Sequence, residues 1–275
     1  MLTLEATEKT TLTPLLKWAG GNRKLAPAIA KFYEPFRATH AWCEPFVGGM
    51  GATLGVMPSV AILNDSNPHL INFYEWVQEG LDPSEWDIDL IYDRQIYEEN
   101  RDFFNLLISK DRAIGPSAAL LFYYLNRSCF NGLCRFNSSG GFNVPFGKYK
   151  TVNYRQDFSQ HQEVFKKWEF TSGDFEKLTW KVCDRPTFTY CDPPYDCPFV
   201  SYSKGGFNWD DQVRLAEWCA SLPGPVLVSN AATERVIELY GKLGFQVETF
   251  PVGRSISCNG DRTPVLEIFA SKNMR

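Results

Sequence analysis

The sequence lacks any apolar run of about 18 residues, the length that a membrane-spanning helix requires. Its first nine residues are polar and acidic, so they do not resemble a secretory signal peptide. We therefore expect a cytoplasmic protein without a membrane partner.

Histidine is also scarce, and the cysteines are scattered. The 275 residues include three histidines and eight cysteines, and no two cysteines form a Cys-x-x-Cys pair. Zinc sites and disulfide frameworks usually show closely spaced ligands. We interpret the cysteines as reduced core or loop residues and expect no metal.

Basic charge is not in excess over the whole chain. The net charge is −4, from 28 Lys and Arg against 32 Asp and Glu, which by itself argues against a nucleic-acid partner. However, residues 9–33 and 115–156 each carry five basic side chains and no acidic one, while acids concentrate between Glu75 and Asp102. This distribution favours a basic surface that meets phosphates, although an ordinary solvated surface explains it too.

Apolar residues make up 44% of the chain, which is enough for a full core in one large domain or two. Runs of apolar and β-branched residues predict seven strands, separated by segments with helical spacing. The strands are expected from residue 41 and at 60–65, 168–172, 187–191, 225–230, 246–252 and 265–271. This alternation is typical of the α/β class.

The stretch between the second and third strands predicts a helical insertion, because residues 67–110 and 116–127 show helical spacing without a parallel-type strand. Residues 126–150 interleave Asn, Gly, Ser and Pro with Phe and basic residues, which predicts a β-hairpin. We interpret Phe142 and Phe146 as structural, and Phe130 and Arg135 as ligand contacts. Inserted stretches often carry substrate choice.

The most informative short motif is Asp192-Pro193-Pro194-Tyr195, which follows the strand at 187–191. An ionised Asp192 accepts hydrogen bonds, the Pro193 carbonyl is a second acceptor, and the Tyr195 ring is a stacking face. Two acceptors that bind both hydrogens of an exocyclic amine turn its lone pair toward an electrophile. A turn with a capping acid is the competing interpretation, since four-residue matches are common.

A glycine loop at 48–51 follows the first strand, and Asp65 ends the second. This order is typical of nucleotide-binding sheets, in which the acid holds ribose hydroxyls. Leu54 stands where the dinucleotide fingerprint needs a third glycine, so an adenosine-type ligand without a pyrophosphate fits better. Asp174, at the end of the 168–172 strand, has two interpretations: it binds the ligand's adenine amine, or it caps the next helix.

Five stretches follow one another along the chain: Leu16–Gly21, Glu44–Gly49, Asn131–Arg135, Phe142–Gly147 and Asp192–Tyr195. In this order they resemble the DNA adenine methyltransferase (Dam) family, and the resemblance covers residues 15–271. It implies a seven-stranded, Rossmann-like methyltransferase sheet with S-adenosylmethionine as cofactor and double-stranded DNA as partner. It also implies base flipping and direct methyl transfer to adenine N6, within GATC, in the cytoplasm of a bacterial or phage-infected cell.

The resemblance also implies roles for single residues. The implied catalytic residues are Asp192, Pro193, Pro194 and Tyr195. The implied cofactor contacts are Trp18, Ala19, Gly20, Asn22, Phe46, Gly48, Asp65, Asp174 and Asp192. The implied DNA contacts are Lys17, Arg127, Phe130, Asn131, Leu133, Arg135 and Pro145. Residues 1–66 and 156–275 would form the catalytic domain and residues 67–155 the DNA target-recognition domain, in a monomer or weak dimer.

One departure from the family concerns the cofactor site. Asn22 stands where members carry Lys after the Gly-Gly pair, so either Arg23 or Lys24 supplies the positive charge or the cofactor contact there is weaker. Phe130 replaces a more usual Tyr, which keeps the ring that wedges into the duplex and removes a hydroxyl.

Three rival functions stay open at this point. Methylation of cytosine N4 uses similar amine chemistry. A DNA-binding regulator without catalysis is disfavoured by the intact 192–195 segment, and a nicotinamide-dependent oxidoreductase by the missing third glycine. The polar loop at 254–262 is either a DNA clamp or a surface connection.

Overall fold

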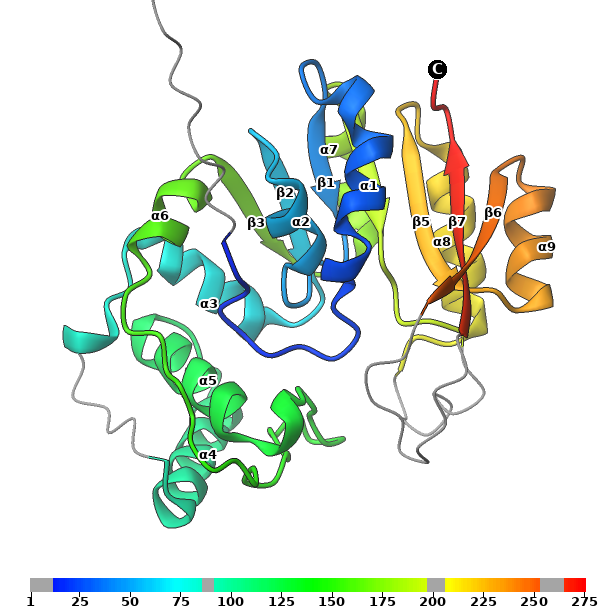
Figure 1. The fold of residues 1–275 in the computed structure, drawn as a ribbon. Helices are drawn as coiled ribbons and strands as arrows, with labels where there is room; N and C mark the ends of the chain where they lie inside the picture. The colour runs from blue at the N-terminus through cyan, green and yellow to red at the C-terminus, as the bar shows by residue number, and fades with distance from the viewer. Residues whose placement is uncertain (1–11, 86–91, 197–205, 253–264) are drawn as a thin grey trace, which may run out of the picture.

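The computed structural model describes residues 12–85, 92–196, 206–252 and 265–275. Its centre is a seven-stranded sheet with the order β3-β2-β1-β4-β5-β7-β6, in which β7 runs antiparallel to both neighbours and the other pairs are parallel (Figure 1). The strands are β1 (Ala41–Glu44), β2 (Ala61–Asp65), β3 (Trp168–Ser172), β4 (Thr187–Cys191), β5 (Val226–Ala231), β6 (Gln246–Val252) and β7 (Val265–Lys272). The seven predicted strands are confirmed.

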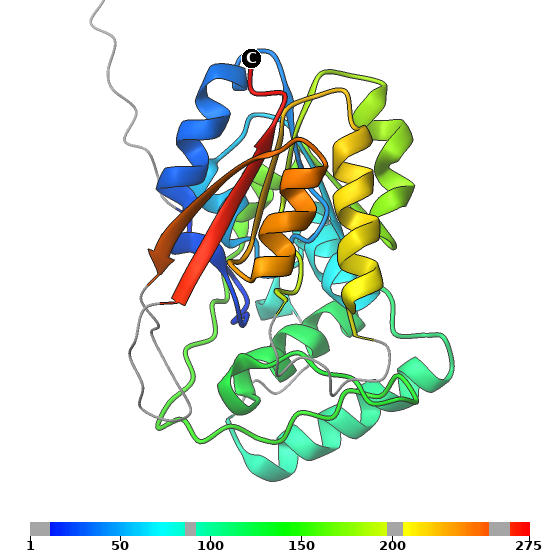
Figure 2. The same cartoon turned by 90° about the vertical axis from the view of Figure 1, so that its right-hand side faces the viewer.

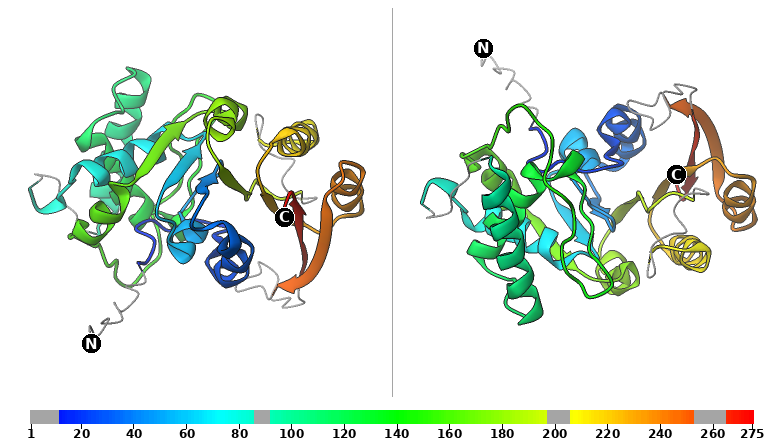
Figure 3. Two further views of the ribbon diagram at one scale, coloured as in Figure 1. Left: turned by 90° about the horizontal axis from the view of Figure 1, so that it is seen from above. Right: turned by 90° about the horizontal axis from the view of Figure 1, so that it is seen from below.

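Helices cover both faces of the sheet, which gives three layers (Figure 3). One face packs on α1 (Ala26–Tyr33), α2 (Gly51–Val56) and α3 (Pro68–Glu79). The other packs on α7 (Thr179–Cys183), α8 (Trp209–Ser221) and α9 (Glu234–Lys242). The α/β class predicted from the sequence is therefore confirmed.

Strand β4 is buried along its whole length and holds the sheet together at its centre. Phe188 and Tyr190 point to the α1 side, where both stack on Trp42 of β1 at 5.6 Å between ring centroids. Burying such a ring contributes roughly 1.5–3 kcal/mol relative to leaving it exposed. This packing fixes the end of β4, from which Asp192 emerges.

The helical insertion between β2 and β3 is confirmed. It contains α3, then α4 (Arg94–Ser109) and α5 (Pro116–Ser128), and α6 (Ser159–Phe165) leads back to the sheet. Helices α4 and α5 lie beyond the edge at which the parallel strands end, which is the lower edge in Figures 1 and 2. The domain boundary at residue 66 stays a prediction. Beyond this boundary, Tyr74 of α3 still contacts the sheet, because its ring stacks on Phe170 of β3.

The predicted β-hairpin is an irregular loop, residues 129–146, which we call the paired loop. It is closed by two isolated antiparallel bridges, Cys129 with Phe146 and Phe136 with Phe142. Regular strands are disfavoured here because Asn131 has a positive φ of 55° and Pro145 has no N–H group. Phe142 is buried, and Phe146 stacks on Tyr92 at 4.5 Å, so both are structural as predicted.

A glycine substitution tests how β5 is held beside β4. A methyl group at Gly224 would overlap the backbone carbonyl oxygen of Thr187, the first residue of β4. We expect Gly224→Ala to destabilise the fold by about 1–3 kcal/mol, measured by urea unfolding. Gly241→Ala, in α9 with no atom near the new methyl group, is the control and should be neutral or stabilising by up to about 1 kcal/mol. Equal stability of the two variants would contradict the steric argument.

Candidate active site

Acidic side chains gather at the edge where the parallel strands end. Glu44 ends β1, Asp65 ends β2, and Asp192 follows β4. Glu267 joins them from β7, because this strand is antiparallel and starts at the same edge. The sheet topology thus brings together carboxyl groups that are far apart in the sequence, as ligand sites in α/β sheets require.

Two donors hold the same oxygen of Asp192. Its Oδ1 atom accepts hydrogen bonds from Asn22 Nδ2 at 2.6 Å and from Ser229 Oγ at 2.9 Å. Asn22 lies in the short 3-10 helix η1 (Asn22–Lys24), and Ser229 lies in β5. The hydroxyl groups of Ser229 and Tyr190 are 2.9 Å apart. Since both donors contact Oδ1, the Oδ2 atom is not held by either of them.

Tyr195 is held by its hydroxyl group. This group donates to Glu267 Oε2 at 3.2 Å and accepts from Asn22 Nδ2 at 3.2 Å. The ring is half-buried. The tyrosine is therefore anchored to β7 at its polar end.

A second set of hydrogen bonds fixes the backbone of the 192–195 segment. Gln212 of α8 donates to the Pro194 carbonyl at 2.7 Å and accepts from Asn230 of β5 at 2.9 Å. Asn230 in turn accepts from the Asp196 backbone N–H at 3.0 Å. In this series of hydrogen bonds the acceptor is the carbonyl of Pro194 and not that of Pro193.

The residue after the segment is tied to α9. The Asp196 carboxylate accepts hydrogen bonds from Thr233 Oγ1 at 2.9 Å and from two nitrogens of Arg235. The hydrogen bonds from Arg235 lower the pKa of Asp196. The acid next to the segment thus acts as an anchor that stays ionised.

Burial changes the proton affinity of the site acids. It raises the pKa of Asp192 to about 7, with a further increase from the charge of Glu267, although hydrogen bonds from Ser229 oppose the shift. Burial likewise raises the pKa of Glu44 to about 8. It also raises the pKa values of Asp65 and Glu267. Buried carboxylates of this kind are stabilised by a cationic ligand.

The glycine loop after β1 makes room for a tryptophan. A Cβ atom on Gly48, whose φ is +45°, would lie 2.7 Å from Trp18 Nε1, and one on Gly49 would lie 2.5 Å from Trp18 Cβ. The Gly48 backbone N–H donates to Asp65 Oδ2 at 3.1 Å. The structure thus brings Trp18, Gly48 and Asp65 together, as expected for one site.

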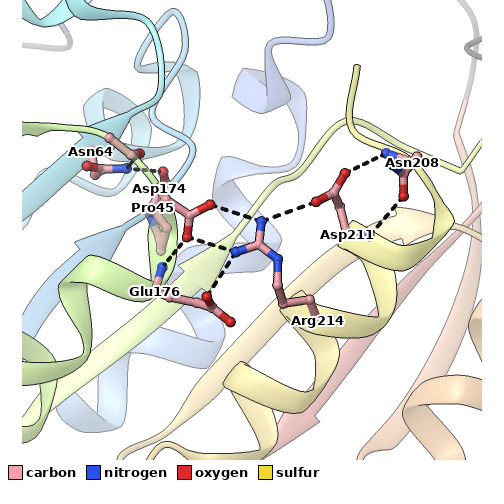
Figure 4. A network of polar contacts seen from close by, with 8 residues as sticks. Pro45, Asn64, Asp174, Glu176, Asn208, Asp211 and Arg214 are labelled. Carbon is pink, nitrogen blue, oxygen red and sulfur yellow. Dashed lines mark hydrogen bonds and ion pairs between the residues drawn. The ribbon is translucent and has the colours of Figure 1, made fainter. Parts of the chain in front are cut away.

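Asp174 takes part in an ion-pair network, shown in Figure 4. Its carboxylate accepts from the Glu176 backbone N–H at 3.0 Å, so the capping interpretation is confirmed. Both of its oxygens also contact Arg214 of α8 at 2.9 Å. The hydrogen bonds from Arg214 lower the pKa of Asp174. A cofactor contact of Asp174 stays a prediction.

An aromatic cluster lies beside this network. Phe46, which follows β1, is 5.7 Å from Phe175 and 5.6 Å from Phe207 between ring centroids. The half-buried Phe46 ring offers a surface to a planar ligand. Aromatic rings and uncompensated carboxylates are the groups that suit a cationic adenosine compound.

Asn126 joins the N-terminal segment to the insertion. Its side chain accepts from the Lys17 backbone N–H at 2.9 Å and donates to the Lys17 carbonyl at 2.8 Å. The Lys17 ammonium lies 3.5 Å from the centroid of the Tyr149 ring, and burial lowers its pKa. A Cβ atom on Gly132 of the paired loop would overlap Lys17 Cβ, so the predicted DNA contact Lys17 packs against this loop.

The other predicted DNA contacts lie mostly on the surface of this loop. Phe130 is 38% exposed, and its N–H donates to the carbonyl of the exposed Pro145 at 2.8 Å. Arg135 is exposed and bonds Asn143 Oδ1 at 2.8 Å. Asn131 is exposed and Leu133 is half-buried.

The Arg127 side chain contacts the segment near Asn153. It donates to the Asn153 carbonyl at 2.6 Å and lines a polar cavity of about 220 Å³ together with Thr13 and Arg155. Of the predicted DNA contacts, Arg127 therefore lies outside the paired loop, as Lys17 does.

Comparison with known proteins decides the family. The sequence model of the D12 class N6 adenine-specific DNA methyltransferases matches residues 18–251. A DNA adenine methylase of Vibrio cholerae is 35% identical over 271 residues, covering 93% of this chain and 94% of that protein. One of Haemophilus influenzae is 33% identical over 273 residues, covering 94% and 92%. This chain belongs to the D12 class of N6 adenine-specific DNA methyltransferases.

The resemblance to the DNA adenine methyltransferase family is thereby confirmed. The protein is an enzyme that methylates adenine in DNA, with S-adenosylmethionine as methyl donor. Cytosine methylation, a regulator without catalysis and a nicotinamide enzyme are correspondingly disfavoured. Among solved structures, a magnesium protoporphyrin IX methyltransferase of Synechocystis with bound S-adenosylmethionine aligns at a TM-score of 0.36 and 8% identity, over 92% of this chain and 80% of that one.

Several groups of this methyltransferase site were missed in the sequence. They are Ser229, Asn230, Gln212 and Glu267. Ser229 and Asn230 carried a usable signal, since polar residues near the carboxyl end of a parallel strand face the same edge as Asp192. Glu267 and Gln212 carried none, because only the tertiary fold brings them to the segment.

In the part of the chain that the structure describes, no group of three or more His, Cys, Asp or Glu side chains is arranged to hold a metal ion. No helix in this part is long and apolar enough to cross a membrane. The loop at 254–262 lies outside the described residues.

The raised pKa values predict how stability depends on pH. A group whose pKa is higher in the folded state stabilises the fold at low pH and loses this effect as pH rises through the folded value. For Asp192 and Glu44 the window runs from about pH 4 to the folded values of about 7 and about 8. We expect the melting temperature of the cofactor-free methyltransferase to fall across this window, by on the order of a few degrees.

Variants identify the groups responsible. Asp192→Asn and Glu44→Gln should each flatten the dependence in thermal melts between pH 5 and pH 8.5, whereas Glu238→Gln, at an exposed position of α9, should not. If all three variants keep the wild-type slope, these two acids are not its source.

Proposed function

We propose that this methyltransferase acts on adenine within GATC in duplex DNA, and that it flips the target base out of the helix before methylation. The main support is the position of the paired loop, which lies beyond the same sheet edge as Asp192 and is joined to the site through the Lys17 segment. The residues from Asn131 to Arg135 support GATC, because they resemble those of family members that act at this site.

Asp192 is assigned the central catalytic role. Its Oδ2 atom and the Pro193 carbonyl would accept the two hydrogens of the adenine amine, which directs the nitrogen lone pair away from the ring. When bound, S-adenosylmethionine would supply an electrophilic methyl group for the nitrogen lone pair, and its sulfur would keep the electrons of the carbon–sulfur bond. The N6 proton then passes to Asp192 or to water. Tyr195 would stack on the flipped base.

The cofactor would lie along the ends of β1, β2 and β3. Asp65 is suited to the ribose hydroxyls, and Phe46 to the adenine ring. Trp18, Ala19, Gly20 and Gly48 are assigned to the wall of this site, and Asp174 to the adenine amine. Because Arg214 occupies both oxygens of Asp174, such a contact needs one of their remaining lone pairs.

Base flipping needs a group that replaces the lost stacking. It costs a few kcal/mol, which contacts of the paired loop must offset. Phe130 is the candidate wedge, since its ring is partly exposed while its backbone is tied to Pro145. Asn131, Leu133, Arg135 and Pro145 are assigned to base recognition, and Lys17 and Arg127 to further DNA contacts.

The remaining assignments follow from the substrate. We place the enzyme in the cytoplasm of a bacterial or phage-infected cell, where its DNA substrate lies, and assign it a monomeric or weakly dimeric state. Residues 67–155 are assigned to target recognition.

Mapping of methylated bases tests site and chemistry together. Expression in cells that lack adenine methylation should produce N6-methyladenine within GATC on both strands, detected by strand-resolved sequencing. Asp192→Ala should abolish methyl transfer because it removes an acceptor of the amine, yet bind DNA within about threefold of wild type. Methylation at another sequence would reject GATC, and near wild-type turnover of Asp192→Ala would reject the catalytic assignment.

Specificity at one base tests Arg135. If its guanidinium reads a guanine, Arg135→Ala should cost roughly 1–3 kcal/mol and relax discrimination at that position only. The measurement is kcat/KM on GATC duplexes and on duplexes with each single substitution. Arg185→Ala, at the opposite end of β4, should leave these ratios unchanged. A uniform loss over all sequences would instead make Arg135 a phosphate contact.

A further inference from the structure

One side chain from the N-terminal segment reaches the reactive carboxylate. Asn22 precedes Asp192 by 170 residues, and its Nδ2 atom lies 2.6 Å from Asp192 Oδ1. The same nitrogen lies 3.2 Å from the hydroxyl groups of both Tyr190 and Tyr195. Asn22 is thus the point at which three groups of the catalytic segment and its strand meet.

The backbone of Asn22 is also fixed from behind. Gly51, the first residue of α2, packs so closely that a Cβ atom there would lie 3.3 Å from Asn22 N and 3.1 Å from Arg23 N. The side chain therefore points into the site from a defined position and is not a mobile surface group.

The neighbours of Asp192 define its electrostatic surroundings. They are Asn22 on η1, Tyr190 on β4, Ser229 on β5, Tyr195, Glu44 on β1 and Glu267 on β7. Two of these neighbours are acids and none carries a positive charge. Asn22 supports the ionised carboxylate by a hydrogen bond alone, whereas a lysine there would add a full charge.

We propose that Asn22 is a positioning residue for methyl transfer, whose uncharged amide orients the Asp192 carboxylate toward the substrate amine and makes residue 22 the control point for the pH dependence of turnover. The inference rests on the catalytic role proposed for Asp192. A protonated carboxyl group accepts the amine hydrogens poorly, so turnover follows the ionised fraction of Asp192. Burial raises the pKa of this group to about 7, which places the effect in the neutral range.

Two substitutions at residue 22 should move the pH profile in opposite directions. Asn22→Leu removes the donor and should lower kcat at least tenfold, with the acid limb of the profile moved to higher pH. Asn22→Lys adds a positive charge beside the carboxylate and should move the acid limb to lower pH by about one unit. Asn100→Leu, which removes an amide that donates to the Ile96 carbonyl within α4, is the matched control and should keep the wild-type profile.

The experiment measures kcat and KM between pH 5.5 and 9, with saturating S-adenosylmethionine and duplex DNA, on variants whose folding is checked by near-ultraviolet circular dichroism. Opposite shifts with KM values within about threefold of wild type support the proposal. Unchanged acid limbs in both variants would overturn it, as would a loss confined to the KM for S-adenosylmethionine, which would make Asn22 a cofactor contact. If Asn22→Leu does not fold, the shift in Asn22→Lys decides. Asp192→Ala separates the two levels, because an active Asp192→Ala overturns the proposed function itself.

Discussion

The burial of one carboxyl group, that of Asp192, is the constraint on which the rest of the site depends. Removing a carboxylate from water costs several kcal/mol unless donors replace the lost hydration. The fold supplies two such donors, Asn22 and Ser229, from opposite ends of the sequence. The part of this cost that the donors do not offset appears as the raised pKa of Asp192. A cationic ligand would reduce it by stabilising the ionised carboxylate.

The surrounding fold makes this arrangement rigid. Aromatic stacking of Phe188 and Tyr190 on Trp42 fixes the strand that carries the acid. Gln212 and Asn230 fix the turn that follows it. Held from both sides, the 192–195 segment needs little reorganisation when a ligand binds, and such preorganisation is what electrostatic catalysis requires.

The sequence predicted the strands and their ends well, because alternation and the positions of Asp65, Asp174 and Asp192 are local patterns. It also predicted the helical insertion between β2 and β3 and the structural character of Phe142 and Phe146. It predicted a β-hairpin where the structure has two antiparallel bridges without regular strands, since Asn131 and Pro145 interrupt the pairing. The contacts of Asn22, Gln212 and Glu267 were beyond prediction, because each depends on packing between segments that no local pattern connects.

The hydrogen bonds between Asn126 and Lys17 restrain the position of the N-terminal segment. They clamp the chain at residue 17 to the insertion, while Asn22 is bound to Asp192 in the sheet. The five peptide units between these two anchors are therefore a tether of fixed length between the helical insertion and the sheet. Adding or deleting one residue in this tether would shift the insertion relative to the sheet, whereas a surface loop would accommodate the same change.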